Sequence, residues 1–155
     1  DLVVKNCVFE NTDNGLRIKS RRGRGGVVRD ITYTDCTLKD CQPVISIMAY
    51  YQDSTYSTFP KDDPAQPLTD TTPVFRNLTI RNVTGASTRE VGAIAGLPES
   101  PVENVLLENV TLSGTGGLLI ANARGVTLKK VKVTVQQGEP VILHNAEVSG
   151  QVEKR

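Results

Sequence analysis

Five stretches of this sequence share one pattern, and this repeat constrains the fold more than any other feature. Each stretch begins with a short alternating strand pattern, has a polar anchor five positions after its start, and continues with a second short apolar segment. The stretches are DLVVKNCVF from residue 1, DITYTDCTL from 30, NLTIRNVTG from 77, NVLLENVTL from 104 and GVTLKKVKV from 125. A third apolar segment begins about ten residues after each anchor.

Three short strands per repeat, with most repeats in the twenties of residues, are typical of a parallel β-helix. The longest interval, from residue 30 to 77, contains residues 52–72, which are rich in Pro, Asp, Ser and Thr and predict a long surface loop. We therefore predict an all-β, right-handed parallel β-helix (a solenoid) of about five coils. It forms a single domain over residues 1–155, with a polar C-terminal tail at 146–155.

Equivalent residues of successive coils should stack about 4.8 Å apart, which predicts two inward ladders. The first contains Leu2, Ile31, Leu78, Val105 and Val126. The second contains Cys7, Cys36, Val83, Val110 and Val131. We interpret Cys7 and Cys36 as small apolar core residues rather than a disulfide, and the redox state of Cys7, Cys36 and Cys41 stays open. The anchors should be structural, with left-handed backbone; they are Asn6, Asp35, Asn82, Asn109 and Lys130.

The first repeat, LVVKNCVF, is already a full coil, and no capping segment precedes it in the sequence. A solenoid end normally needs such a cap, because an uncovered coil leaves an open sheet edge. We therefore expect an incomplete helix that is open at its N-terminal end, and that associates with itself through this end or is only marginally stable.

The charge is nearly balanced overall but unevenly distributed. The net charge of +1 argues against a nucleic-acid partner, and no apolar run approaches the roughly 18 residues of a membrane span. Six cations and no acid lie between Asn14 and Arg29, which favours a local anionic partner over a solvated basic turn. The six are Arg17, Lys19, Arg21, Arg22, Arg24 and Arg29.

The strand LRIK, after an Asn-Gly turn, presents two of these cations to solvent. Leu16 and Ile18 belong inside, so Arg17 and Lys19 should project outward, about 6.6 Å apart. Together they can grip one carboxylate, since Arg supplies a planar fork and Lys a point charge. The next coil should place Ser46 beside Arg17, Met48 beside Lys19 and Tyr50 near Arg21. An aromatic ring beside a cationic pair suits a sugar acid.

Four segments carry a resemblance to a known family: NGLRIKS, ISIMAYY, TPVFRNLTIRNVTG and GLPESPVENVLLENVTL. They resemble the C-terminal half of a bacterial polygalacturonase of glycoside hydrolase family 28. The resemblance implies a right-handed parallel β-helix and inverting hydrolysis of α-1,4-linked galacturonic acid in pectin. It also implies that Arg17 and Lys19 bind the carboxylate of a galacturonate next to the scissile bond. Tyr50 matches a substrate-contacting tyrosine of the family.

The same resemblance implies several further properties. Arg21 and Arg22 are additional candidates for substrate binding, and neither a cofactor nor a metal is expected. The partner is a galacturonate-containing polysaccharide or oligosaccharide, with no nucleic acid and no membrane. A polymer outside the cell implies a secreted or periplasmic enzyme.

The hydrolytic residues of the family are not found at the sequence positions where the family has them. Family members use aspartates from an Asn-Thr-Asp segment and an Asp-Asp pair, with a Gly-His-Gly histidine, all several coils before Arg-Ile-Lys. Here sixteen residues precede Arg17. Asp13 lies in the Asn-Gly turn, the Asp62-Asp63 pair lies in the long loop, and His144 should lie roughly 20 Å from Arg17. We therefore expect no catalytic residue in this chain, and an inactive isolated chain.

Other functions explain less of the sequence. A non-catalytic β-helix module that binds anionic polysaccharide is the main alternative. A structural β-helix of the phage-fibre or adhesin kind accounts for the repeats but not for Arg17, Lys19 and Tyr50 together. A calcium-dependent lyase would need an acidic cluster on the Arg17 face. The sequence leaves open endo or exo action, the preferred pectin and whether the chain is part of a longer one.

Overall fold

A computed structural model describes residues 1–51 and 59–153 of the protein. These residues form strands and connecting loops, and they contain no helix that is long and apolar enough to cross a membrane. The strands are β1 (Leu2–Lys5), β2 (Val8–Glu10), β3 (Leu16–Lys19), β4 (Val27–Lys39), β5 (Ile45–Met48), β6 (Val74–Ala86), β7 (Gly92–Ala95), β8 (Val102–Gly114), β9 (Leu118–Val135) and β10 (Val141–Val152).

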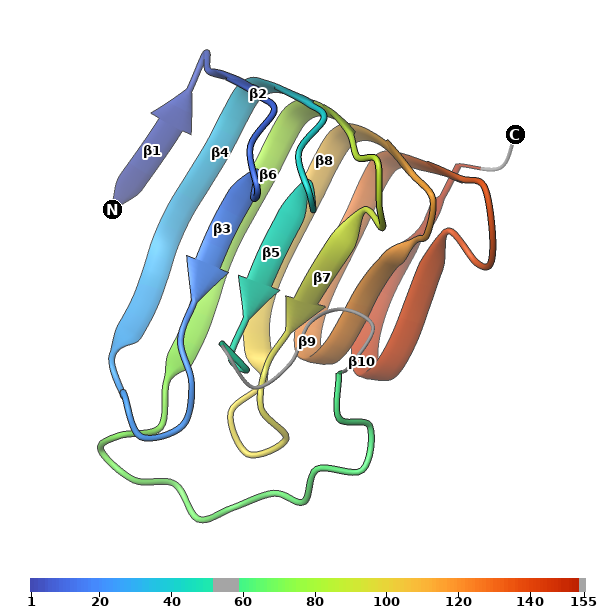
Figure 1. Ribbon diagram of the computed structural model, residues 1–155. Coiled ribbons are helices and arrows are strands. Elements are labelled where there is room, and N and C mark those ends of the chain that lie inside the picture. Colours follow the sequence, from blue (N-terminus) through green and yellow to red (C-terminus); the bar gives the residue numbers. More distant parts are fainter. Residues whose placement is uncertain (52–58, 154–155) are drawn as a thin grey trace.

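The strands form one curled parallel sheet with the order β1-β4-β6-β8-β9-β7-β5-β3. Strand β2 pairs with β4, and β10 pairs with β9. The long strands β4, β6 and β8 form one wall, and the short strands β3, β5 and β7 form a facing wall (Figure 1). Strand β9 belongs to both walls, because it pairs first with β7 and then with β8. This arrangement confirms the predicted parallel β-helix.

The core lies between the two walls, and the predicted ladders fill it. Ile31 pairs in register with Leu2 and Leu78, and the ladder continues through Val105 to Val126. The second ladder runs from Cys36 to Val131 through Val83 and Val110, all 2% exposed or less. Cys7, Cys36 and Cys41 are free thiols, as the core interpretation of Cys7 and Cys36 requires.

The anchors of the repeat have the predicted left-handed backbone, with φ between 50° and 56° at Asn6, Asp35, Asn82, Asn109 and Lys130. Their side chains also bond along the solenoid. Asn82 donates to Asp35 at 2.9 Å, and Asn109 donates to Asn82 at 2.9 Å. The positions at the repeat starts form a parallel row, in which Asn77 donates to Asp30 at 2.8 Å and Asn104 to Asn77 at 3.2 Å. The side chains of both rows therefore bond to one another at the left-handed positions inside the long strands β4, β6 and β8.

The C-terminal residues differ from the prediction of a polar tail. Residues 146–152 belong to β10, which pairs with β9 as far as Val152. The reason is that Ala146, Val148 and Val152 are apolar and pack against the core, while the residues between them point outward.

The predicted long loop lies partly outside the described residues, because 52–58 are not among them. We call its described part, residues 59–73, the strap. It begins beside β9 and β10 and runs along the strand ends back to β6 (Figure 1).

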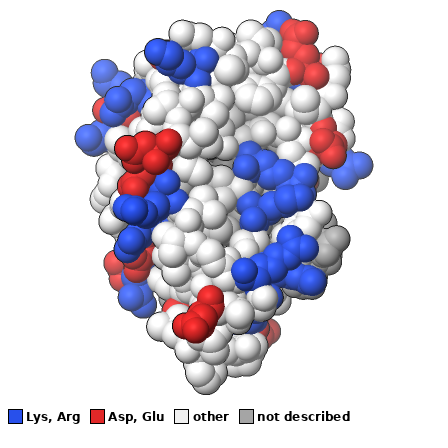
Figure 2. Space-filling view, turned by 90° about the vertical axis from the view of Figure 1, so that its left-hand side faces the viewer, with Lys and Arg blue, Asp and Glu red and all other residues white. Residues whose placement is uncertain are grey.

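The N-terminal end of the solenoid is open among the described residues. There β1, β2 and β3 each pair with a strand on one side only. Leu2 and Val8 are 52% and 64% exposed, although Leu2 is in register with a core ladder. Figure 2 views this end and shows a broad central area without Lys, Arg, Asp or Glu, with charged side chains along its margins. The predicted open edge is therefore present in the fold.

Candidate functional site

Strand β3 places Arg17 and Lys19 on the outer face of the short-strand wall. Leu16 and Ile18 are buried and both cations are exposed, as the alternation predicts. The preceding Gly15 is required by packing, because a Cβ there would lie 2.4 Å from the carbonyl oxygen of Val44. The register of β3 with β5 places Arg17 beside Ser46 and Lys19 beside Met48, which confirms the predicted alignment.

An aromatic ring lies against this cationic pair, and it belongs to Tyr51. Lys19 Nζ lies 4.0 Å from the ring centroid, and the guanidinium carbons of Arg17 and Arg24 lie 5.4 and 5.5 Å from it. A hydrogen bond with Lys19, and then the charges of Lys19, Arg17 and Arg24, lower the pKa of the Tyr51 hydroxyl. We call Arg17, Lys19, Arg24 and Tyr51 the cationic surface. It combines three positive charges with one apolar ring face, which together suit an anionic sugar.

Tyr50, the predicted substrate contact, lies elsewhere. It is 5% exposed, and its hydroxyl donates a hydrogen bond of 2.8 Å to Asp63 Oδ2. Burial, and next the hydrogen bond to Asp63, raise the pKa of this hydroxyl. Strand alternation from Met48 made Tyr50 the outward residue, but β5 ends at Met48 and the chain turns there. The substrate contact of Tyr50 stays a prediction, and the turn brings Tyr51 to the cations.

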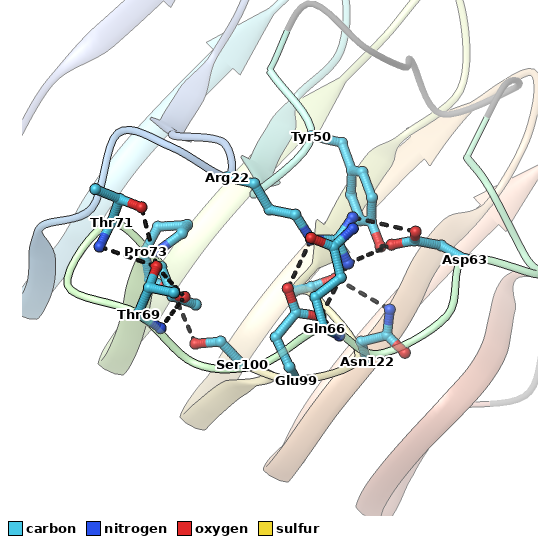
Figure 3. Close-up of polar contacts among 12 residues, drawn as sticks. Arg22, Tyr50, Asp63, Gln66, Thr69, Thr71, Pro73, Glu99, Ser100 and Asn122 are labelled. Atoms are coloured by element: carbon cyan, nitrogen blue, oxygen red, sulfur yellow. Dashed lines mark hydrogen bonds and ion pairs between the residues drawn. The ribbon is translucent and has the colours of Figure 1, made fainter.

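Arg22 joins three loops through ion pairs (Figure 3). Its Nε lies 2.6 Å from Glu99 Oε1 and its Nη2 lies 2.9 Å from Glu99 Oε2, while Nη2 also lies 2.7 Å from Asp63 Oδ2. Hydrogen bonds to Glu99 and then to Asp63 raise the pKa of Arg22. Its hydrogen bonds in turn lower the pKa of both carboxyl groups. The charge of Arg22 is thus balanced inside the protein, and Arg21 lies half-buried in the same turn.

The acidic and histidine motifs lie in three different parts of the fold: a turn, the strap and β10. Thr12 donates a hydrogen bond of 2.8 Å to the carbonyl of Asn14, so Asp13, which is exposed, belongs to the predicted turn. Asp62 is exposed on the strap. His144 lies in β10 with its ring edge against Phe59, and their ring centroids are 5.7 Å apart. Within residues 1–51 and 59–153, no three His, Cys, Asp or Glu side chains form a group that could hold a metal ion.

Comparison with known proteins gives consistent matches. The family model described as Glycosyl hydrolases family 28 matches residues 1–136. A probable polygalacturonase of Vitis vinifera is 26% identical over 112 residues, covering 72% of this chain and 21% of the relative. An endo-polygalacturonase of Pectobacterium carotovorum is 26% identical over 130 residues, covering 84% and 28%. A polygalacturonase of Medicago sativa is 30% identical over 129 residues, covering 81% and 28%.

The matched region is a limited part of each relative. The chain spans between 21% and 28% of the length of these three proteins. No solved structure matches the chain significantly.

Proposed function

This chain belongs to glycosyl hydrolase family 28, and from that premise we propose that it is the carboxylate-binding part of a polygalacturonase. The enzyme would hydrolyse α-1,4-linked galacturonic acid in pectin with inversion, outside the cell or in the periplasm. The observation that carries the proposal is the cationic surface, where Arg17 and Lys19 lie exposed on adjacent outward positions of β3 beneath the ring of Tyr51.

Each residue of the cationic surface has a role in binding a galacturonate. Arg17 offers its planar guanidinium to the two carboxylate oxygens, and Lys19 adds a point charge from the neighbouring outward position. The Tyr51 ring offers an apolar face to the sugar. Arg24 raises the positive potential at the same place. Arg22 is ion-paired with Asp63 and Glu99, and these contacts support the turn.

We place the catalytic carboxylates outside these 155 residues. Inverting hydrolysis needs an acid and a base about 6.5–9.5 Å apart with room for water between them. The carboxylates of the described loops beside the cationic surface include Asp63 and Glu99, and both are ion-paired with Arg22. This arrangement, and the share of the relatives that the chain spans, support a part of a longer enzyme. That this part is the C-terminal one stays a prediction. Its bacterial origin stays a prediction.

Binding of a galacturonate oligomer by isothermal titration calorimetry tests the proposal. We expect Arg17→Ala to weaken binding at least tenfold and Lys19→Ala to weaken it less, because Arg17 supplies two hydrogen bonds to one carboxylate. Raising the salt concentration should also weaken binding. Arg29→Ala is the matched control, because Arg29 is exposed in β4 and pairs with Asp30. Equal affinity of Arg17→Ala and the parent chain would contradict the proposal.

The ion pairing of Asp63 and Glu99 also favours the second candidate, a module that binds anionic polysaccharide without cutting it. Release of reducing ends from polygalacturonate by this chain decides whether it contains catalytic groups. We expect none, even at high protein concentration over many hours. Measurable release would place the catalytic carboxylates in this chain, with Asp13 and Asp62 as the first candidates.

A further inference from the structure

The outer face of the short-strand wall changes character beyond the cationic surface. Two outward rows continue along the solenoid in register from Arg17 and Lys19. One contains Arg17, Ser46, Ala93, Leu119 and Ile142, and the other contains Lys19, Met48, Ala95, Ala121 and His144. On β7 and β9 these outward side chains are apolar and at most 4% exposed. These two strands therefore offer no accessible polar side chain to a sugar on this face.

Phe59 contacts the last residue of the second row and the turn that follows β5. Its ring makes an edge contact with Tyr50, with centroids 5.4 Å apart, and another with His144, with centroids 5.7 Å apart. In this row Ala95 and Ala121 lie in register between Met48 of β5 and His144 of β10, and Tyr50 follows Met48 by two residues. The Phe59 ring is 8% exposed and lies between the turn after β5 and strand β10. We call Tyr50, Phe59 and His144 the aromatic wall.

The aromatic wall is tied to the turn that follows the cationic surface. Asp63, four residues after Phe59 on the strap, accepts the hydrogen bond from Tyr50 and pairs with Arg22 (Figure 3). Arg22 also pairs with Glu99, whose side chain is 5% exposed. Because Arg22 lies three residues after Lys19, these contacts fix the wall relative to the carboxylate-binding residues.

A polysaccharide that lies along the solenoid needs an open face on each coil that it crosses, and coils are about 4.8 Å apart. The face is open at β3 and filled at β7 and β9. We propose that Arg17, Lys19 and Tyr51 form the last subsite of the binding surface, so that they hold a galacturonate at the end of a chain. This inference rests on the proposed function and adds to it a preference for chain ends, which Phe59 imposes.

End-modified hexagalacturonates test this inference with the chain as it is. Three forms are titrated by calorimetry: unmodified, reduced to the alditol at the reducing end, and carrying a 4,5-unsaturated uronate at the non-reducing end. We expect one modification to weaken binding at least tenfold and the other to change it less than twofold, because only one end enters the last subsite. Binding of both modified forms within twofold of the unmodified hexamer would overturn the inference and leave the proposed function standing.

A hexamer that does not bind the parent chain at all would overturn the proposed function, and this inference with it. If it binds, and Arg17→Ala weakens binding at least tenfold, the proposed function stands independently of the end-group result. The two failures are therefore distinguishable.

Variants of Phe59 test the aromatic wall directly. Phe59→Ala removes the ring. We expect this variant to bind the modified hexamer that the parent protein binds weakly with an affinity within threefold of that for the unmodified hexamer. The reason is that the polysaccharide can then pass over β7 and β9. Phe59→Leu, the matched control, keeps much of the volume and should keep the discrimination. Thermal unfolding checks that both variants fold. A folded Phe59→Ala variant that discriminates between the hexamers as strongly as the parent would overturn the role of Phe59. The end-group test itself needs no variant.

Discussion

Arg17 and Arg22 lie five residues apart in one basic stretch, and the fold uses their charges differently. Arg17 is exposed beside Tyr51, where it can meet an anion from solution. Arg22 is held by Glu99 and Asp63, which lie 77 and 41 residues further along the chain. A local sequence pattern assigns both residues to the same turn. The contact partners, which come from distant loops, decide which of the two charges is available to a ligand.

At the residue scale we predict that Glu99→Gln lowers the free energy of unfolding by about 1–3 kcal/mol, because it weakens two charge-assisted hydrogen bonds to Arg22. The control is Glu108→Gln, which removes an exposed ion pair with Arg81 and should cost less than about 1 kcal/mol. Urea unfolding measures both. Equal losses of unfolding free energy in the two variants would show that the Arg22 contacts contribute no more to stability than an exposed ion pair.

The same contacts predict a dependence of stability on pH. The pKa values of Asp63 and Glu99 are lowered in the folded protein, chiefly by Arg22. Their contribution to the free energy of unfolding is therefore complete above the ordinary carboxyl pKa values of about 4. It is lost as the pH falls through the lowered pKa values. Urea unfolding at several values between pH 7 and pH 3 should show this loss. The stability of the double variant Asp63→Asn, Glu99→Gln should depend less on pH in that acid range. An unchanged dependence would contradict the assignment of this pH dependence to Asp63 and Glu99.

At the scale of the elements, the asparagine rows connect one coil to the next. Asn82 has a φ of 52°, donates to Asp35 and accepts from Asn109. Asparagine suits this position because its short side chain tolerates left-handed backbone and bonds to its neighbours above and below. Lys130 occupies the equivalent position in β9 with a φ of 50° and without an amide side chain.

We predict that Asn82→Ala lowers the free energy of unfolding by about 2–3 kcal/mol, since it combines left-handed strain with the loss of two hydrogen bonds. Asn82→Gly should cost about 1 kcal/mol, because glycine tolerates the backbone and loses only the bonds. Lys130→Asn should raise the free energy of unfolding by up to about 1 kcal/mol, because asparagine tolerates left-handed backbone better than lysine. Urea unfolding ranks the three variants. A loss as large for Asn82→Gly as for Asn82→Ala would rule out the backbone contribution.

At the scale of the whole molecule, the N-terminal end presents an unpaired parallel edge with exposed apolar side chains. Strands β1, β2 and β3 each have one partner among the described residues, and Leu2, Val3 and Val8 are more than half exposed. Edges of this kind pair with other chains unless they are covered or charged. The structure thus presents the kind of edge from which we predict self-association of the isolated chain.

Sedimentation velocity at several concentrations tests this prediction. We expect the parent chain to associate and Val8→Lys to reduce the association, because a charge on β2 opposes edge pairing. Leu143→Lys is the matched control, since Leu143 is similarly exposed but lies in β10 at the other end of the solenoid. A monomeric parent chain at all concentrations, or an equal effect of the two variants, would contradict association through the N-terminal end.

The sequence alone determined the coils, the ladders and the outward direction of Arg17 and Lys19. These features follow from local periodicity, because strand alternation sets the face of each residue and the repeat sets its neighbours on adjacent coils. The left-handed anchors were predictable for the same reason, since Asn and Asp recur at fixed positions of the repeat.

The tertiary structure decided what lies around the carboxylate-binding pair. It brought Tyr51 rather than Tyr50 to the cations, paired Arg22 with Asp63 and Glu99, and set Phe59 against His144. It also extended β10 through the predicted tail to Val152. These contacts depend on where each loop leaves its coil and what it packs against. No repeat encodes them, because the loops differ from coil to coil while the strands do not.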